Sequence, residues 1–182
     1  HGGAFFEALG EDFDALGGPS TVISAAVLDA WFPPAPSVLE AIQDYLPLLL
    51  RTSPPTSCAG LVRAIARARG VGPANIVAGG GSSDLIFLAL TRWLSPASRV
   101  LILDPMYGEY AHVLEEVVGC RVDRLALFRA DGYVLDPIRL VDRLRKTPYD
   151  LAIIVNPNSP TGRHVSRVAL QDVIEGAPTQ TR

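Results

Sequence analysis

The sequence has little lysine, cysteine or methionine, and it has no long uninterrupted apolar run. It contains 2 Cys and 1 Met, and Lys146 is the single lysine among its 16 basic residues. No apolar run reaches the ~20 residues that cross a bilayer, which argues against a membrane protein. A net charge of −3 provides no concentrated basic surface, which argues against a nucleic acid as partner.

The two cysteines, Cys58 and Cys120, have neither C-x-x-C spacing nor the Cys/His spacing of a metal site. We therefore expect both to be small core residues of a protein from a reducing compartment, which predicts a cytoplasmic location. The sequence begins at His1 and not at methionine, and it shows no signal peptide. We therefore expect it to be part of a longer chain.

What the sequence does contain is an alternation of apolar segments with stretches of helical spacing. The predicted strands are 75–78, 99–103, 121–127 and 151–155, and the predicted helices that alternate with them are 60–69, 82–94, 107–118, 137–146 and 166–174. This alternation predicts an α/β fold with a mostly parallel sheet flanked by helices. The almost fully apolar strands fit a sheet that is covered on both faces.

The domain organisation follows from the same pattern. We expect an N-terminal arm with a first helix over 1–50, an α/β domain over 51–176 and a polar tail over 177–182. The first helix is predicted at 38–49, with Ser37 as its N-cap.

The first candidate site is the glycine-rich turn 79–84 (GGGSSD), between a predicted strand and a predicted helix. Glycines let the backbone approach an anion, a helix start offers unpaired N–H groups, and the two serines add hydroxyl donors. This pattern fits a phosphate cradle and a simple tight turn equally well. It is neither a Walker loop nor a dinucleotide fingerprint, because it lacks G-K-[ST] and the required glycine spacing.

Two further candidate sites each follow a predicted strand, at 104–110 (DPMYGEY) and at 156–162 (NPNSPTG). A tyrosine there can lay its ring on a flat aromatic ligand, and an asparagine fixed between prolines can donate a hydrogen bond. The alternatives are an ordinary packing tyrosine and a proline-stiffened loop in which one X-Pro bond can be cis. A single phosphate-bearing aromatic ligand at one edge of the sheet would explain all three segments.

The order GGGSSDLI, DPMYGEY and VNPNSPTG resembles the fold type I pyridoxal-phosphate enzymes, the class I/II aminotransferases. Within them it is most similar to histidinol-phosphate aminotransferase and threonine-phosphate decarboxylase, from about Leu28 to about Ile174. The resemblance implies that 51–176 is part of a cofactor-binding large domain. It implies a homodimeric, pyridoxal 5′-phosphate-dependent aminotransferase acting on a small amino acid or amino-phosphate. The alternatives are a threonine-phosphate decarboxylase-like lyase and a non-catalytic remnant that binds a phospholigand or a partner chain.

The resemblance also implies roles for individual residues. Gly81, Ser82 and Ser83 would bind the cofactor phosphate, and Tyr107 would stack on the pyridine ring.

The asparagine that bonds the ring's phenolic oxygen in the family has two candidate positions in this chain. The family has Asn directly before Pro-Thr-Gly, whereas this chain has Ser159 there and Asn158 one residue earlier. We prefer Asn158 for this role and keep Ser159 as the alternative. His1 resembles a histidine of the decarboxylase branch that helps to bind a substrate phosphate.

In the relatives, the Schiff-base lysine and the aspartate that pairs with the pyridine nitrogen follow the NPNSPTG motif. Lys146 is predicted at the opposite end of the sheet, at the end of a helix. We therefore assign no catalytic residue and expect this chain alone to be inactive. Its incomplete sheet would expose an edge, which predicts dimers or larger assemblies.

Overall fold

The computed structural model describes residues 12, 23, 30 and 32–182. The chain divides into two compact units, His1–Ser57 and Cys58–Arg182. The candidate substrate residue His1 lies outside the described residues.

The first unit contains helix α3, Pro36–Arg51, whose side chains are all exposed. The expectation that Ser37 is the N-cap is wrong. The helix begins two residues earlier than predicted, at Pro36 after Ala35, because a proline fits the first helical turn without losing a backbone hydrogen bond. Among the described helices, α3 included, none has both the length and the apolar character needed to cross a membrane.

The second unit is an α/β domain, as predicted. Its elements are α4 Ala59–Arg69, η1 Pro73–Asn75, α5 Ser82–Trp93, β1 Arg99–Asp104, α6 Gly108–His112, η2 Val113–Val118, β2 Arg121–Ala126, η3 Arg129–Asp131, α7 Pro137–Lys146, β3 Leu151–Ile153 and α8 Arg167–Gly176. The three strands form a parallel sheet in the order β2-β1-β3.

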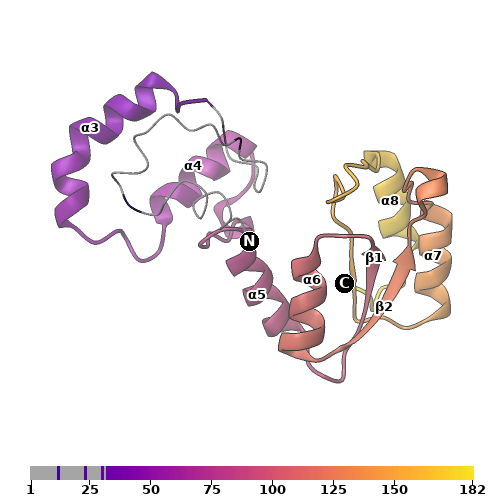
Figure 1. Ribbon diagram of the computed structural model, residues 1–182. Helices are drawn as coiled ribbons and strands as arrows, with labels where there is room; N and C mark the ends of the chain where they lie inside the picture. Colours follow the sequence, from indigo (N-terminus) through magenta and orange to yellow (C-terminus); the bar gives the residue numbers. More distant parts are fainter. Residues whose placement is uncertain (1–11, 13–22, 24–29, 31) are drawn as a thin grey trace. The chain divides into compact units, whose positions relative to one another are not determined.

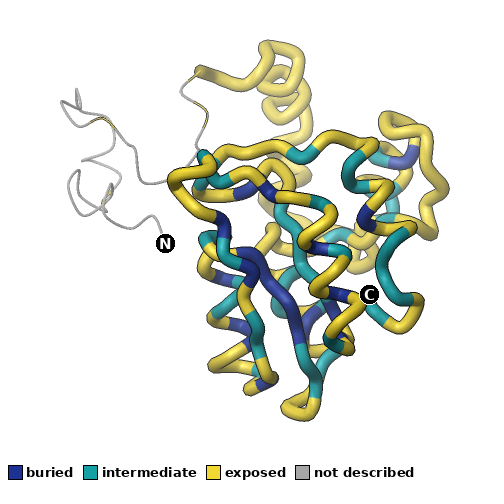
Figure 2. The backbone as a smooth tube through the Cα atoms, turned by 90° about the vertical axis from the view of Figure 1, so that its right-hand side faces the viewer, coloured by how far each residue is buried: buried dark blue, intermediate teal, exposed yellow. Residues whose placement is uncertain are grey.

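The central strand β1 separates two hydrophobic clusters, because successive side chains of a strand point to opposite faces. Leu101 and Leu103 pack with residues of α7 and α8, whereas Val100 and Ile102 pack with residues of α5 and η2. Figure 1 shows α6 on one side of β1 and β2, with α7 and α8 on the other. Four consecutive residues of β1 are buried, and buried residues gather around the sheet in Figure 2. The central strand is therefore covered on both faces.

The predicted strand at 75–78 is wrong. Residues Pro73–Asn75 form a short 3-10 helix, and although Ile76 has extended dihedrals (φ −123°, ψ 126°), it joins no strand of the described sheet. Val77 is 70% exposed. An extended apolar segment becomes a strand only where a neighbour completes its ladder of hydrogen bonds.

The predicted helix 107–118 forms, but it changes character along its length. It is α-helical as α6 and π-helical as η2, and it ends at Gly119, which has a φ of +72°. The following Cys120 is buried, and its thiol donates to the Leu114 carbonyl over 3.3 Å. The core assignment of Cys120 is thus confirmed, whereas Cys58 is exposed before α4 and its core assignment is wrong.

The last residues contact the domain. The Arg182 N–H donates to the Asp150 carbonyl (3.1 Å), and the Ala152 N–H donates to the Arg182 carbonyl (2.9 Å). Arg182 therefore pairs with the outer edge of β3, which the sequence alone did not indicate.

The cap of α8 provides a first testable prediction. The Ser166 hydroxyl accepts a hydrogen bond from the Ala169 N–H (3.2 Å) and caps the helix. Replacing Ser166 by alanine should lower the free energy of unfolding by about 1 kcal/mol, because a first-turn N–H loses its acceptor. Urea unfolding measures this loss. Ser159→Ala, the same change at an exposed serine, should alter stability by less than about 0.5 kcal/mol, and equal losses in both variants would contradict the capping role.

Candidate functional site

Two of the three candidate segments meet at the carboxyl ends of neighbouring parallel strands. The segment 104–110 follows β1 and the segment 156–162 follows β3. They touch directly, since the Asn158 side-chain Nδ2 donates to the Pro105 carbonyl over 3.0 Å. The peptide bonds before Pro105, Pro157 and Pro160 are cis. Carboxyl ends of parallel strands are where open α/β sheets bind ligands.

The glycine-rich turn leads into α5 without a side-chain cap. Gly81 has φ 114° and ψ 179°, a conformation that is essentially open only to glycine. The first N–H groups of α5, from Ser82 onward, therefore have no capping side chain and carry the positive end of the helix dipole. The Gly80 N–H instead donates to the Asp84 carboxylate over 2.8 Å, which fixes the turn. This arrangement fits an anion.

A buried carboxylate links this turn to the segment 104–110. The Ser83 hydroxyl donates to Glu109 Oε2 over 2.9 Å, although the two residues lie 26 positions apart. The pKa of Tyr107 is raised, first by its hydrogen bond with Glu109 and next by desolvation, while Ser83 lowers it. Three side chains thus form one polar cluster, and the three sequence segments come together as predicted.

Glu109 is the residue that the sequence analysis did not single out. It is only 7% exposed. The sequence does place Glu109 between Tyr107 and Tyr110, within the candidate segment 104–110. A charged side chain at this position either faces solvent or belongs to the candidate site. The rings of those tyrosines meet edge-on, with centroids 6.2 Å apart and planes at 79°.

The geometry distinguishes Asn158 from Ser159. Asn158 is 4% exposed, and its Nδ2 donates to both Pro105 O and Thr161 Oγ1. Its Oδ1 is buried without a partner among the described residues. Both amide protons are thus engaged in holding the loop, whereas Ser159 is exposed. These contacts favour Asn158 as a structural residue of the loop and Ser159 as the side chain available to a ligand.

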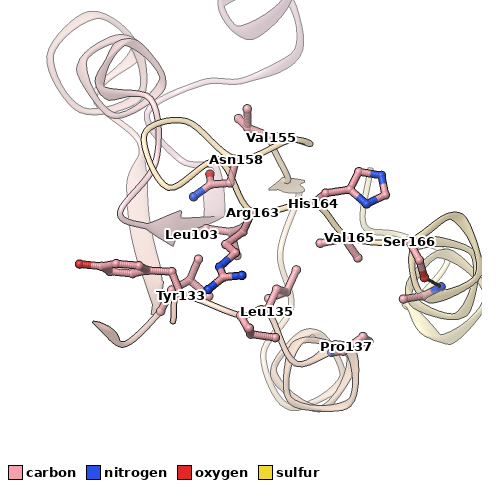
Figure 3. Close-up of a pocket in the computed structure, with 14 residues that line it drawn as sticks. Leu103, Tyr133, Leu135, Pro137, Val155, Asn158, Arg163, His164, Val165 and Ser166 are labelled. Carbon is pink, nitrogen blue, oxygen red and sulfur yellow. Dashed lines mark hydrogen bonds between the residues drawn. The ribbon is translucent and has the colours of Figure 1, made fainter. Parts of the chain in front are cut away.

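A pocket of about 510 Å³ opens beside this loop, between the loop and the starts of α7 and α8. Figure 3 shows Arg163 below Asn158, with Leu103, Leu135 and Val165 among the apolar side chains of the wall. The Arg163 guanidinium Nε donates to the Gly132 carbonyl, so this arginine ties the loop to a neighbouring turn.

A charged network surrounds Asp123 of β2, on the side of the sheet nearer the amino ends of its strands. The Asp123 carboxylate accepts hydrogen bonds from Arg99 (2.6 and 3.1 Å), Arg143 (3.2 Å) and the Tyr149 hydroxyl (2.7 Å). Burial raises the pKa of Asp123, but the hydrogen bonds from Tyr149 and Arg99 and the charges of Arg99 and Arg143 outweigh it and hold the pKa below its ordinary value. Lys146 is exposed at the end of α7, shortly before β3 begins. It therefore lies toward the amino ends of the strands, whereas the candidate ligand site lies at their carboxyl ends.

Comparisons with known proteins agree with this geometry. The family model for aminotransferase class I and II matches residues 26–180. Histidinol-phosphate aminotransferase of Moorella thermoacetica is 26% identical over 163 residues, which are 88% of this chain and 40% of that protein. This chain therefore spans well under half the length of that relative.

Solved structures show the same fold. N-Succinyldiaminopimelate aminotransferase of Mycobacterium tuberculosis is similar with a TM-score of 0.65 and 30% identity, over 78% of this chain and 39% of that one. Histidinol-phosphate aminotransferase of Sinorhizobium meliloti, solved in complex with pyridoxal-5′-phosphate, is similar with a TM-score of 0.70 and 24% identity. The match covers 81% of this chain and 39% of that one. At this last identity the likeness concerns the fold.

Proposed function

Because this chain belongs to the aminotransferase class I and II family, we propose that the whole protein is a pyridoxal-phosphate-dependent aminotransferase. Its substrate would be a small amino acid or amino-phosphate. The observation that carries the proposal is the convergence of an uncapped helix start, a tyrosine and a proline-fixed loop at one sheet edge. A phosphate-bearing aromatic ring is the ligand that uses all three.

The residues at this edge fit the cofactor. Gly81, Ser82 and Ser83 would hold its phosphate through backbone N–H and hydroxyl groups, and Tyr107 would pack on the ring. Ser159, or Asn158 after a rearrangement of its loop, would donate to the ring's phenolic oxygen. The cofactor itself supplies an electron sink for the substrate's α-carbon. The residues of this chain would bind and orient the cofactor without forming a Schiff base with it, because Lys146 lies toward the amino ends of the strands.

We also propose that the protein is a cytoplasmic homodimer. Both cysteines are free thiols, which suits a reducing compartment. Helix α3 exposes large apolar side chains, among them Leu46, Leu49 and Leu50, and a patch of this kind marks an association surface. Light scattering should show dimers or larger assemblies, and a strictly monomeric species at micromolar concentration would count against the proposal.

Borohydride trapping tests the cofactor assignment. The purified chain with pyridoxal phosphate should bind through the phosphate without covalent capture at Lys146, and Lys146→Arg should leave the affinity unchanged. Reduction by borohydride followed by peptide mapping measures capture. A specific, stoichiometric adduct on Lys146 would overturn the assignment of the site to the opposite edge.

The reaction is tested on the complete reading frame. We expect a Ser-x-x-Lys-type segment beyond Arg182, and a holoenzyme that transfers an amino group from histidinol phosphate or another amino substrate. Release of carbon dioxide from threonine phosphate without amino transfer would favour the lyase. Absence of any such lysine from the natural protein would favour a non-catalytic, ligand-binding remnant.

A further inference from the structure

The proposed function leaves unused the pocket beside the loop 156–162. Its volume is about 510 Å³, within the range of about 300–1,000 Å³ that is typical of small-molecule sites. It lies on the face of the sheet that α7 and α8 cover, and Ser82, Ser83 and Tyr107 are not among its lining residues. An occupant of this pocket would therefore be distinct from the cofactor.

The floor and walls of this pocket are largely apolar. Leu103, Leu127 and Leu135 are buried residues of the hydrophobic cluster on this face, and Tyr133 and Val165 pack against it. Apolar side chains around an open space favour an apolar occupant, because filling the space removes water and adds van der Waals contacts. The pocket therefore suits the apolar part of a small molecule.

Arg163 brings a positive charge into the same pocket. Its side chain extends from the loop toward Tyr133 and Leu135 in Figure 3. Its Nε donates to the Gly132 carbonyl, and a Cβ on Gly132 would stand 2.5 Å from its Nη2, so the guanidinium lies against the backbone of that turn. It forms no ion pair with any aspartate or glutamate of the described residues. The guanidinium has further N–H donors for a ligand oxygen.

The surroundings of Arg163 favour an anion. None of the described residues that line the pocket is acidic. Helix α8 starts at its rim without an acidic residue in the first turn, so the positive end of its dipole adds to the arginine charge. The acids closest in sequence, Asp131 and Asp136, are outside the lining, and Asp136 caps α7 by accepting the Ile138 N–H.

The loop wall of the pocket also contains a buried acceptor. Asn158 lines the pocket, and its Oδ1 has no hydrogen-bond partner among the described residues. The amide is not reversed, because Nδ2 donates to the Pro105 carbonyl. Buried polar atoms are nearly always satisfied, so an unsatisfied one in a pocket wall points to an occupant. An apolar floor with a few polar groups at one side is the usual composition of a small-molecule site.

We propose that this pocket is a second binding site of the domain, for a small carboxylate that carries an apolar or aromatic group. The carboxylate accepts hydrogen bonds from the Arg163 guanidinium, and the apolar group lies over Leu103, Leu127 and Leu135. No covalent bond forms or breaks. The site goes beyond the proposed function, because it needs neither the glycine-rich turn nor Tyr107.

An NMR titration of the labelled chain with 3-phenylpropionate tests this site. We expect saturable amide shifts at Val134, Arg163 and Val165, without shifts at Gly81, Ser82 or Ser83. The neutral counterpart 3-phenylpropionamide should bind roughly tenfold more weakly, because a hydrogen bond to a charged group is stronger than one between neutral groups. Shifts centred on the glycine-rich turn, or equal affinities for both compounds, would overturn the proposal.

Replacing the arginine tests which group holds the carboxylate. Arg163→Gln should weaken the binding of 3-phenylpropionate by roughly tenfold and leave the affinity for the amide unchanged. The matched control is Arg167→Gln, which removes an exposed arginine of α8 that does not line the pocket. This control should bind as wild type.

A second pair of variants leaves the bond between Arg163 and Gly132 in place. Val134 lines the pocket and is 58% exposed, so Val134→Asp is expected to fold and to repel the carboxylate. Val117→Asp, the same change on η2 outside the pocket lining, should bind as wild type, and circular dichroism checks that all variants are folded. Wild-type affinity in Arg163→Gln or in Val134→Asp would overturn the proposal. Pyridoxine 5′-phosphate should bind all four variants equally, so failure of this site and failure of the cofactor site are distinguishable.

Discussion

Replacing Gly81 by alanine is expected to weaken the binding of pyridoxine 5′-phosphate by about tenfold to a hundredfold. At φ 114° and ψ 179° a Cβ is disfavoured by about 1–3 kcal/mol, whatever the free space around it. Nothing lies within 4 Å of the position where that Cβ would stand, so the effect is one of backbone conformation and not of a clash. The turn relaxes, and the N–H groups of α5 no longer converge on the phosphate.

The matched control is Gly60→Ala in α4. Gly60 also has open space around its Cβ position but no positive φ, and alanine there favours the helix. Isothermal titration should therefore show wild-type affinity for this control. Equal affinities in Gly81→Ala and Gly60→Ala would contradict a phosphate cradle at the start of α5.

Replacing Asp123 by asparagine is expected to lower the free energy of unfolding by about 2–3 kcal/mol near pH 7. Its side chain is 14% exposed and pairs with Arg99, whose side chain is 28% exposed. Asparagine keeps one neutral acceptor oxygen but loses the negative charge, which leaves the partly buried Arg99 guanidinium without its counter-ion and weakens the hydrogen bond from Tyr149. Arg143, at 43% exposure, adds little because solvent screens it. Denaturant unfolding measures the loss, with the exposed Asp172→Asn as the control.

The same variant has a defined pH dependence. The folded chain lowers the pKa of Asp123 below its ordinary value, since hydrogen bonds and positive charge outweigh burial. The stabilisation is therefore fully present above the unfolded pKa of about 3.9 and is lost as the pH falls through the lower, folded value. The stability difference between wild type and Asp123→Asn should shrink as the pH falls below about 4. A difference that stays constant with pH would show that the carboxylate charge is not its source.

The sequence predicts the elements whose partners lie within the chain. The segment 99–103 is apolar on both faces, and it forms the central strand because helices cover both sides of it. The segment 75–78 is equally apolar but finds no neighbouring strand among the described residues. Apolar residues indicate that a segment tends to be buried. A strand also needs a neighbouring strand for its hydrogen bonds, and the residues of the segment do not specify that neighbour.

The site shows a similar limit. The motifs after β1 and β3 predict that their loops meet, because ends of parallel strands share an edge. The glycine-rich turn follows no strand, and its link to them is the hydrogen bond from Ser83 to Glu109. The motifs do not predict the choice between Asn158 and Ser159, since this depends on the bonds of Asn158 to Pro105 and Thr161. Glu109 was missed because its role depends on Ser83, 26 residues earlier. A contact between residues so far apart in the chain arises from the tertiary structure and produces no recognisable motif in the sequence.

We propose that the carboxyl ends of the strands of this sheet hold the phosphate and ring of a pyridoxal-type cofactor. An NMR titration of the labelled chain with pyridoxine 5′-phosphate, and with pyridoxine as its phosphate-free counterpart, tests it most directly. We expect amide shifts at Gly81, Ser82 and Ser83 with the phosphate ester alone, accompanied by shifts around Tyr107. Shifts confined to the residues around Asp123, or identical shifts with both ligands, would contradict a cofactor site at the carboxyl ends of the strands.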